Sequence, residues 1–184
     1  MRSVEIRRHA ERDANEDLTA NGVAQARRAR ESLAFPYDAY YVSPAKRARL
    51  TMAAFGIADA TVEERLAPRP NPPFARFGGR HEGLMAAGMD AVTAWYAIRE
   101  CVPMLRENGR TALAGVLDIA AKLPDGGRAL AVSHGGTIEP LAVAAIGRSF
   151  EDLFARRELD YCEGIRVALR EGRVAGIDVV RLPR

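Results

Sequence analysis

Short apolar segments alternate with helix-like segments along this chain, and that alternation restricts its fold more than any other feature. Four segments have the aliphatic, β-branched and aromatic composition of strands: residues 4–8, 39–43, 61–66 and 129–133. Helical segments separate them. Strands that alternate with helices favour an α/β three-layer sandwich with a mostly parallel central sheet.

Residues of cap and turn type mark where these elements begin and end. Thr19 is a predicted N-cap for a helix over residues 22–33, because its hydroxyl oxygen is able to accept from an unpaired amide. Gly56 and Gly147 each follow a predicted helix, as glycine commonly does. The other expected elements are helices over 45–55, 89–106, 111–122 and 137–146, and a hairpin of 163–169 and 174–180 around Gly172. No repeat or linker divides residues 1–184, so a single domain is expected.

The overall composition excludes several classes of protein. With 48% hydrophobic and 28% charged residues the chain is ordinary for a globular protein, and no apolar run reaches the roughly 18 residues of a membrane-spanning helix. The net charge of +3 comes from arginines spread along the chain, so neither a nucleic-acid nor a membrane partner is expected. Cys101 and Cys162 form no CxxC pair and are expected to be reduced thiols of a cytoplasmic protein.

Polar groups follow three of the predicted strands. Arg8 and His9 end the first strand, and Ser43 ends the second. His134 follows the fourth. Because sites in such folds lie beyond the carboxyl ends of the strands, we expect these side chains to meet at one edge of the sheet.

Four short segments follow one another over residues 1–147. They are Arg8-His9-Ala10-Glu11; Leu18-Thr19 with Gly22 and Gln25-Ala26; Ser43-Pro44-Ala45-Lys46-Arg47-Ala48 followed by Thr51; and Ser133-His134-Gly135-Gly136. In this order they resemble the motifs of the histidine phosphatase superfamily, the phosphoglycerate mutase-like branch 1. Each motif is weak alone, and the set is highly specific. Ala10 stands where the family usually has glycine, which matters if that position needs a positive φ.

The resemblance implies a covalent mechanism. His9 would be the catalytic nucleophile, attacking phosphorus through a neutral ring nitrogen, and a phosphohistidine intermediate splits one hard displacement into two easier ones. Arg8 and Arg47 would bind the phosphate oxygens, and His134 would add a further catalytic donor. This arrangement needs no metal and no cofactor, and the sequence has no HxH, HExxH or CxxC ligand set.

The leaving-group oxygen also needs a proton, which a carboxylic acid near the third strand usually supplies in this family. Glu64 is the first choice, because it lies towards the end of that strand. Glu63 should face the other way, although a one-residue change of register would exchange the two. Glu82, in a segment that resembles the family's WEGL motif, and Glu139, after the second histidine, are the other candidates.

Residues 68–83 are expected to form an irregular loop that sets specificity. The segment contains four of the ten prolines and three glycines. Loops of this length inside a compact domain are usually functional or mobile. Its arginines, Arg69, Arg76 and Arg80, could reach a second anionic group on a substrate.

The sequence therefore predicts a phosphatase that hydrolyses a phosphomonoester, with a small phosphorylated metabolite as its substrate. A phosphohistidine-protein substrate is an alternative, because some short bacterial relatives of this size act on phosphohistidine and lack an obvious donor. A phosphoglycerate mutase-like phosphotransferase and a non-catalytic sensor of phosphate ligands are two more. The sequence makes no prediction of the oligomeric state.

Overall fold

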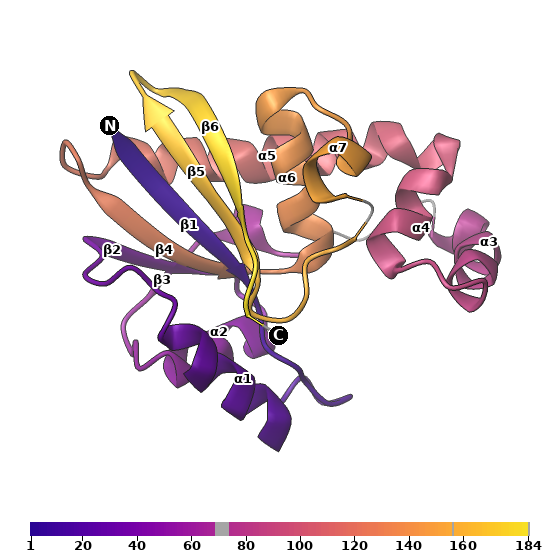
Figure 1. The fold of residues 1–184 in the computed structure, drawn as a ribbon, viewed down its shortest axis with the longest axis horizontal. Coiled ribbons are helices and arrows are strands. Elements are labelled where there is room, and N and C mark those ends of the chain that lie inside the picture. Colours follow the sequence, from indigo (N-terminus) through magenta and orange to yellow (C-terminus); the bar gives the residue numbers. More distant parts are fainter. Residues whose placement is uncertain (69–73, 156, 184) are drawn as a thin grey trace.

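A computed structural model describes residues 1–68, 74–155 and 157–183 of the chain. Within them, six strands form one sheet in the order β3-β2-β4-β1-β5-β6 (Figure 1). The strands are β1 (Arg2–Arg8), β2 (Ala39–Val42), β3 (Thr61–Val62), β4 (Arg128–Ser133), β5 (Gly164–Arg170) and β6 (Arg173–Val180). The first four neighbours pair in parallel, and β5 and β6 extend the sheet as antiparallel strands.

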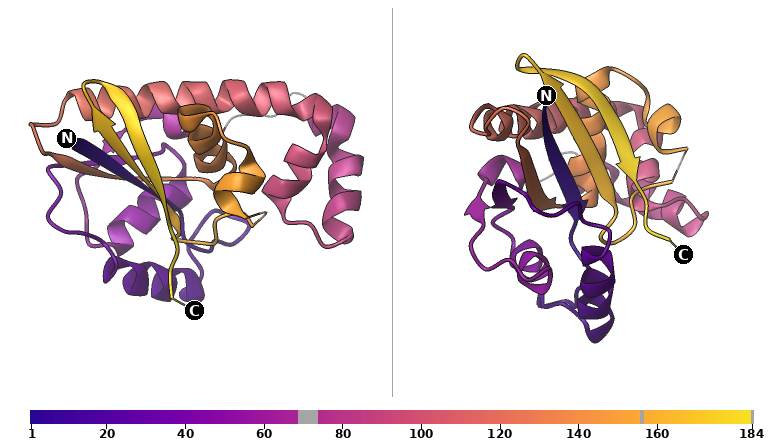
Figure 2. Two further views of the ribbon diagram at one scale, coloured as in Figure 1. Left: turned by 45° about the horizontal axis from the view of Figure 1, so that its top comes forward. Right: turned by 60° about the vertical axis from the view of Figure 1, so that its left-hand side comes forward.

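Helices cover both faces of the sheet (Figure 2). The helices are α1 (Ala20–Arg30), α2 (Lys46–Ala54), α3 (Phe74–Ala86), α4 (Ala91–Ala97), α5 (Val102–Ala121), α6 (Gly135–Ile146) and α7 (Phe150–Phe154), with single 3-10 turns η1 (Glu64–Leu66) and η2 (Arg99–Cys101). Ala129 and Ala131 of β4 pack in the core with α5 and α6, and Leu130 and Val132 pack with α1 and α2. This alternation follows from the two-residue period of a strand, and it confirms the predicted three-layer sandwich with a mostly parallel sheet.

The helices α3 and α4 lie at one end of the molecule, beyond the carboxyl ends of β1 and β4 (Figure 1). Buried Trp95, Ile98 and Leu105 form a small core there, against which Phe77 and Leu84 of α3 pack. This end of the molecule therefore forms a wall opposite the edge of the sheet where polar groups were expected.

Three predicted caps and turns are confirmed. The Thr19 hydroxyl accepts from the Gly22 amide at 2.9 Å and caps α1. Gly147 ends α6 in the left-handed region at φ 67°, and Gly172 turns β5 into β6 at φ 74°. Glycine tolerates this backbone region because it has no Cβ.

The predicted loop over residues 68–83 is wrong from residue 74 onwards, where α3 begins. Residues 69–73, which include Arg69, lie outside the described part of the chain. Phe77, His81 and Leu84 recur at helical spacing, and their packing against α4 outweighs the glycines of the segment. The predicted strand over 61–66 is also shorter than expected, because η1 replaces its second half.

The predicted helices over 89–106 and 111–122 divide at a different place. The chain breaks at Ile98, whose ψ of 98° is extended, and α5 then continues through Gly109 without interruption. A Cβ on Gly109 would lie 2.1 Å from the carbonyl oxygen of Pro140. Gly109 therefore allows α5 and α6 to approach closely and does not end a helix. In the described ranges, no helix is long and apolar enough to cross a bilayer.

Candidate active site

The carboxyl ends of β1 and β4 meet at a cavity of about 270 Å³. Arg8 pairs with Ser133 in the parallel ladder, so the residues that follow, His9 and His134, emerge side by side. Their ring centroids are 5.2 Å apart. Arg47, in the first turn of α2, also lines this cavity. The structure thus brings together four of the five predicted site residues.

The ring of His9 is held in one tautomer. Its Nδ1 lies 2.8 Å from the carbonyl oxygen of Ala10, and because a carbonyl only accepts, Nδ1 carries the proton. The lone pair of Nε2 accepts from Nε of Arg47 at 3.1 Å. Burial lowers the pKa of His9 to about 4, so the ring is neutral near pH 7.

Arg47 also orients the second histidine. Its Nε donates to Nδ1 of His134 at 3.2 Å, so the proton of that ring is on Nε2, which donates to Oγ of Ser43 at 2.7 Å. Burial lowers the pKa of His134 to about 2. Nη1 of Arg47 donates to the carboxylate of Glu16, a residue that no sequence motif indicated. One guanidinium therefore connects both imidazoles.

Arg8, which also lines the cavity, is held in place by Glu158. Its Nη1 donates to Oε1 of Glu158 at 3.2 Å and to the carbonyl of Leu159, and its guanidinium lies 4.8 Å from the centroid of the Tyr161 ring. The other carboxylate oxygen of Glu158 accepts from the amide of Val92 at 3.1 Å. Nε of Arg8 is buried and has no hydrogen-bond partner among the described residues. Glu158 lies in the segment after α7, where no motif identifies it.

Thr51 ties the nucleophile segment to α2. Its hydroxyl oxygen accepts from the amide of Ala10 at 3.0 Å and donates to the carbonyl of Arg47 at 2.8 Å. Ala10 is completely buried and does not have a positive φ, so its methyl group occupies space where glycine is usual without backbone strain. The Thr51 hydroxyl therefore fixes the distance between the segment that carries His9 and the helix that carries Arg47.

The motif around α1 supports the segment that follows His9. Glu11 accepts from the Thr19 hydroxyl at 2.6 Å and from Nδ2 of Asn21 at 2.8 Å, and its amide donates to Oε1 of Gln25 at 3.0 Å. A Cβ on Gly22 would lie 2.0 Å from the carbonyl oxygen of Glu11. These residues hold the segment after His9 in place and do not line the cavity.

Three of the four carboxyl groups predicted as donors lie on or near the surface. Glu64 begins η1 and is exposed, and Glu82 is exposed on α3. Glu63 accepts from Arg65 at 2.7 Å, a hydrogen bond that lowers the pKa of its carboxyl group. None of them lines the cavity, and of the carboxyl groups in the described ranges only Glu158 does.

Glu139, the fourth candidate, is completely buried in α6 and does not line the cavity either. Its Oε1 accepts from the amide of Leu159 at 3.0 Å, and its Oε2 has no partner among the described residues. Burial raises the pKa of this carboxyl group to about 8. In the part of the chain that the structure describes, no group of His, Cys, Asp and Glu side chains is arranged to hold a metal ion.

The arginines expected to reach a second anionic group do not line the cavity. Arg76 is exposed and stacks on the ring of Phe77, with 5.2 Å between its guanidinium carbon and the ring centroid. Arg80 lies 3.5 Å from the carboxylate of Glu100 on the surface. Arg69 belongs to the residues that the structure does not describe. The two described arginines therefore make local contacts on the surface.

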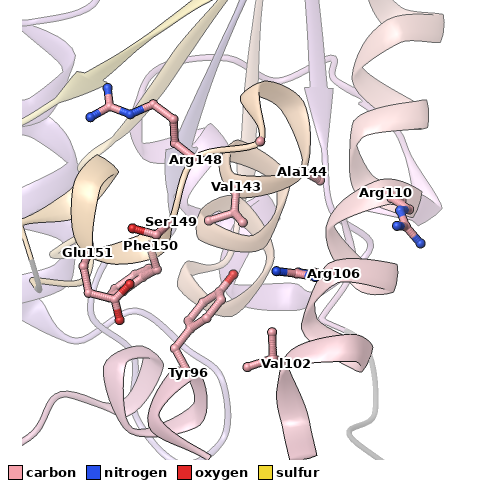
Figure 3. A pocket seen from close by; sticks show the side chains of 11 residues that line it. Tyr96, Val102, Arg106, Arg110, Val143, Ala144, Arg148, Ser149, Phe150 and Glu151 are labelled. Carbon is pink, nitrogen blue, oxygen red and sulfur yellow. The ribbon is translucent and has the colours of Figure 1, made fainter. Parts of the chain in front are cut away.

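A second hollow, of about 520 Å³, lies between α4, α5 and the turn from α6 into α7 (Figure 3). Val143 and Phe150 lie along it, and Arg106 extends towards the hydroxyl of Tyr96. Neither histidine of the candidate site lines it, so we place the site at the smaller cavity.

A comparison of the whole sequence identifies the family of this chain. The chain matches the family model of the histidine phosphatase superfamily (branch 1) over residues 4–179. It therefore belongs to this superfamily, and the resemblance inferred from the four motifs is confirmed. No curated protein matches the sequence.

Solved structures with a similar fold include two phosphatases and a mutase. A phosphoserine phosphatase from Entamoeba histolytica, in complex with 3-phosphoglyceric acid, is 16% identical over 97% of each chain, with a TM-score of 0.68. A mycobacterial glucosyl-3-phosphoglycerate phosphatase in complex with VO3 is 18% identical over 100% of each chain, also with a TM-score of 0.68. A phosphoglycerate mutase from Bacillus anthracis is 14% identical over 97% of this chain and 92% of that one, with a TM-score of 0.61. At these identities the likeness shows the fold.

Proposed function

We propose that this chain is a phosphomonoesterase that works through a covalent phosphohistidine at His9 and requires no metal. The observation that carries the proposal is the contact between the neutral Nε2 of His9 and the guanidinium of Arg47. A phosphoryl group bound by Arg47 is thereby placed at the only unprotonated nitrogen of the nucleophile ring. Positioning and charge stabilisation of this kind provide most of the catalysis in phosphoryl transfer.

In the first step, Nε2 of His9 forms a bond to phosphorus as the bond from phosphorus to the leaving-group oxygen breaks. Nδ1 keeps its proton and donates to the carbonyl of Ala10, which stabilises the positive charge that develops on the ring. Arg8 and Arg47 stabilise the negative charge of the phosphoryl oxygens, and Nε of Arg8, which has no partner among the described residues, provides a donor for one of them. The leaving-group oxygen takes a proton from solvent and departs as an alcohol, and the water of the second step returns a proton to solvent.

In the second step, water attacks phosphorus and the bond to Nε2 breaks. The water gives up a proton, inorganic phosphate leaves, and His9 returns to its neutral form. Nδ1 of His134 accepts from Arg47 in the free site, so it must gain a proton before it donates to a phosphate oxygen. A bound phosphate dianion favours that proton, because an anion nearby stabilises an imidazolium.

A small phosphorylated molecule is the substrate class that the cavity favours. Its volume of about 270 Å³ lies just below the usual range of ligand pockets, about 300–1,000 Å³, so a small ligand is favoured. The two similar phosphatases act, by their names, on a phosphorylated amino acid and a phosphorylated glycerate. We propose that residues 1–184 form one catalytic unit of this kind, which acts in the cytoplasm.

The test is hydrolysis of p-nitrophenyl phosphate without added metal by wild type and His9→Ala. We expect turnover by wild type and its loss, by several orders of magnitude, in the variant, whose folding is checked by circular dichroism. Rapid quenching with a labelled substrate should trap a phosphoprotein that is stable in base and labile in acid. Binding of phosphate without turnover of any ester would favour a sensor, and a labelled residue other than His9 would refute the mechanism.

A further inference from the structure

The cavity continues beyond the phosphate-binding groups into a wall of apolar side chains. Trp95 and Val92 come from α4, Leu105 from α5 and Pro140 from α6, and all four are buried residues that line the cavity. We call these four residues the distal wall. An apolar surface of this kind favours contact with an apolar part of a ligand.

The charges of the lining are distributed unevenly. Its two cationic side chains, Arg8 and Arg47, both lie at the histidines, where they contact Glu158 and His9. Among the described lining residues, the distal wall has no cation, and the nearest polar side chain on α5 is the amide of Asn108. Against the described part of the lining, a second anionic group on the substrate would therefore meet apolar surface and would approach the carboxylate of Glu158.

Trp95 is fixed in position by α3 and by its own helix. The ring of His81 stacks on the indole with 4.0 Å between centroids, and Nε2 of His81 lies 2.8 Å from the carbonyl of Ala91 in the first turn of α4. The indole is buried, with 8% of its surface exposed. A rigid aromatic wall costs little conformational entropy when a flat ligand group packs against it.

We propose that this site selects phosphomonoesters whose leaving group is apolar or aromatic and carries no second negative charge. The proposal rests on the proposed phosphatase function and names its substrate class. It differs from the expectation that arginines of the 68–83 segment bind a second anion. It also implies a substrate unlike 3-phosphoglyceric acid, the ligand with two anionic groups in the structure of the similar phosphoserine phosphatase.

Two inhibitors that are not hydrolysed provide a matched test of binding: benzylphosphonate, and the same molecule with a para-carboxylate. Trp95 is the only tryptophan of the chain, so its fluorescence reports contact with the distal wall directly. We expect benzylphosphonate to shift the emission and to bind at least about tenfold more tightly than the carboxylated compound. Equal affinity, or tighter binding of the carboxylated compound, would overturn the proposal.

A substitution at Asn108 tests the charge argument. Asn108→Arg places a cation on the distal side of the cavity, at a half-buried helical position where arginine is a good helix former. We expect it to reduce or reverse the preference for the uncharged compound. Glu107→Gln changes the net charge by the same amount at an exposed neighbouring residue outside the cavity, and it should keep the wild-type preference.

Turnover separates this inference from the proposed function. Benzyl phosphate, which is an alkyl ester as 3-phosphoglycerate is, should be hydrolysed with a kcat/KM at least about tenfold above that of 3-phosphoglycerate. Activity that depends on His9 but favours 3-phosphoglycerate would refute the substrate class and leave the phosphatase function standing. Absence of any His9-dependent turnover, with the phosphonate preference intact, would refute the function and leave the specificity of the cavity standing.

Discussion

Nε of Arg47 lies 3.1 Å from Nε2 of His9. In the free protein the Arg47 guanidinium therefore donates a hydrogen bond to the lone pair of the nucleophilic nitrogen. The same N–H group lies 3.2 Å from Nδ1 of His134. A single donor shared between two neutral rings is weakly held, and an entering phosphate replaces it with charge-assisted bonds. The contact thus aligns the nucleophile before binding and is given up during binding.

Removal of the Arg47 side chain should lower kcat more than it weakens substrate binding. We expect Arg47→Ala to lower kcat by about 10²–10³-fold, the loss typical of one transition-state donor. Arg47→Lys should recover only part of this, because an ammonium lacks the planar fork of donors that binds two phosphate oxygens at once. Steady-state kinetics with p-nitrophenyl phosphate measure the effect, and Arg49→Lys, exposed on the same helix, is the control. Wild-type kcat in Arg47→Lys would show that the shared contact has no catalytic role.

The carboxyl groups Glu64 and Glu158 should respond differently to conversion to glutamine. Glu64→Gln should keep wild-type kcat/KM, because that side chain is exposed on η1 and outside the cavity. Glu158→Gln should lower kcat/KM by about ten- to a hundredfold, because Glu158 holds Arg8 in place. Rates for alkyl and aryl phosphates should fall together, since a positioning residue acts on both.

A proton donor would give a different pattern. Its loss slows esters with poor alkyl leaving groups far more than aryl esters, whose phenolates leave readily. A selective loss on alkyl phosphates in Glu64→Gln would restore the sequence-based choice of that residue as the acid. The same selective loss in Glu158→Gln would make Glu158 a donor.

The strand ends and caps were predictable because local chemistry determines them. His9 and His134 follow buried strands, and parallel pairing of those strands brings their carboxyl ends together whatever the rest of the chain does. Thr19 and Gly147 contact residues about one helical turn away, so the local sequence is enough to predict them as helix ends. For such features the sequence contains all the necessary contacts.

The parts that could not be predicted depend on contacts between distant segments. α3 forms through packing of Phe77 and Leu84 on the core around Trp95, although its glycines favour a loop. The predicted break between residues 106 and 111 does not occur, because α5 continues through Gly109, which is in close contact with Pro140. Glu158 reaches Arg8 across 150 residues of sequence. The distal wall and Glu158, which bear on specificity, come from these segments.

Gly22 should be intolerant of any side chain. A Cβ at this position would lie 2.0 Å from the carbonyl oxygen of Glu11, a backbone atom that accepts from the amide of Thr19 at 3.2 Å. Gly22→Ala should lower the free energy of unfolding by about 1–3 kcal/mol, as overpacking does. Gly79→Ala, in α3 with open space around the position, should be neutral or stabilising because alanine favours a helix. Urea denaturation of both variants measures the difference, and equal stability would mean that α1 shifts freely.

Glu139 makes the stability of the fold depend on pH in an unusual direction. Burial raises its pKa to about 8 from the ordinary value of 4.5. Between these values the folded protein keeps a proton that the unfolded chain releases. The unfolded state therefore binds fewer protons, and stability falls as pH rises, by at most about 1.4 kcal/mol per pH unit. This contribution is complete below pH 4.5 and is lost as the pH passes through about 8.

Glu139→Gln should remove this dependence while keeping the acceptor for the Leu159 amide. The carboxamide has no proton to lose, so we expect the Tm of wild type to fall relative to that of the variant as the pH is raised from about 5 to 8. Thermal melts across this range measure the difference, and Glu82→Gln, an exposed glutamate on α3, should follow wild type. If the curves of wild type and Glu139→Gln stay parallel, the carboxyl group is ionised in the folded state, and the positive charge of Arg8 then outweighs the cost of burying it.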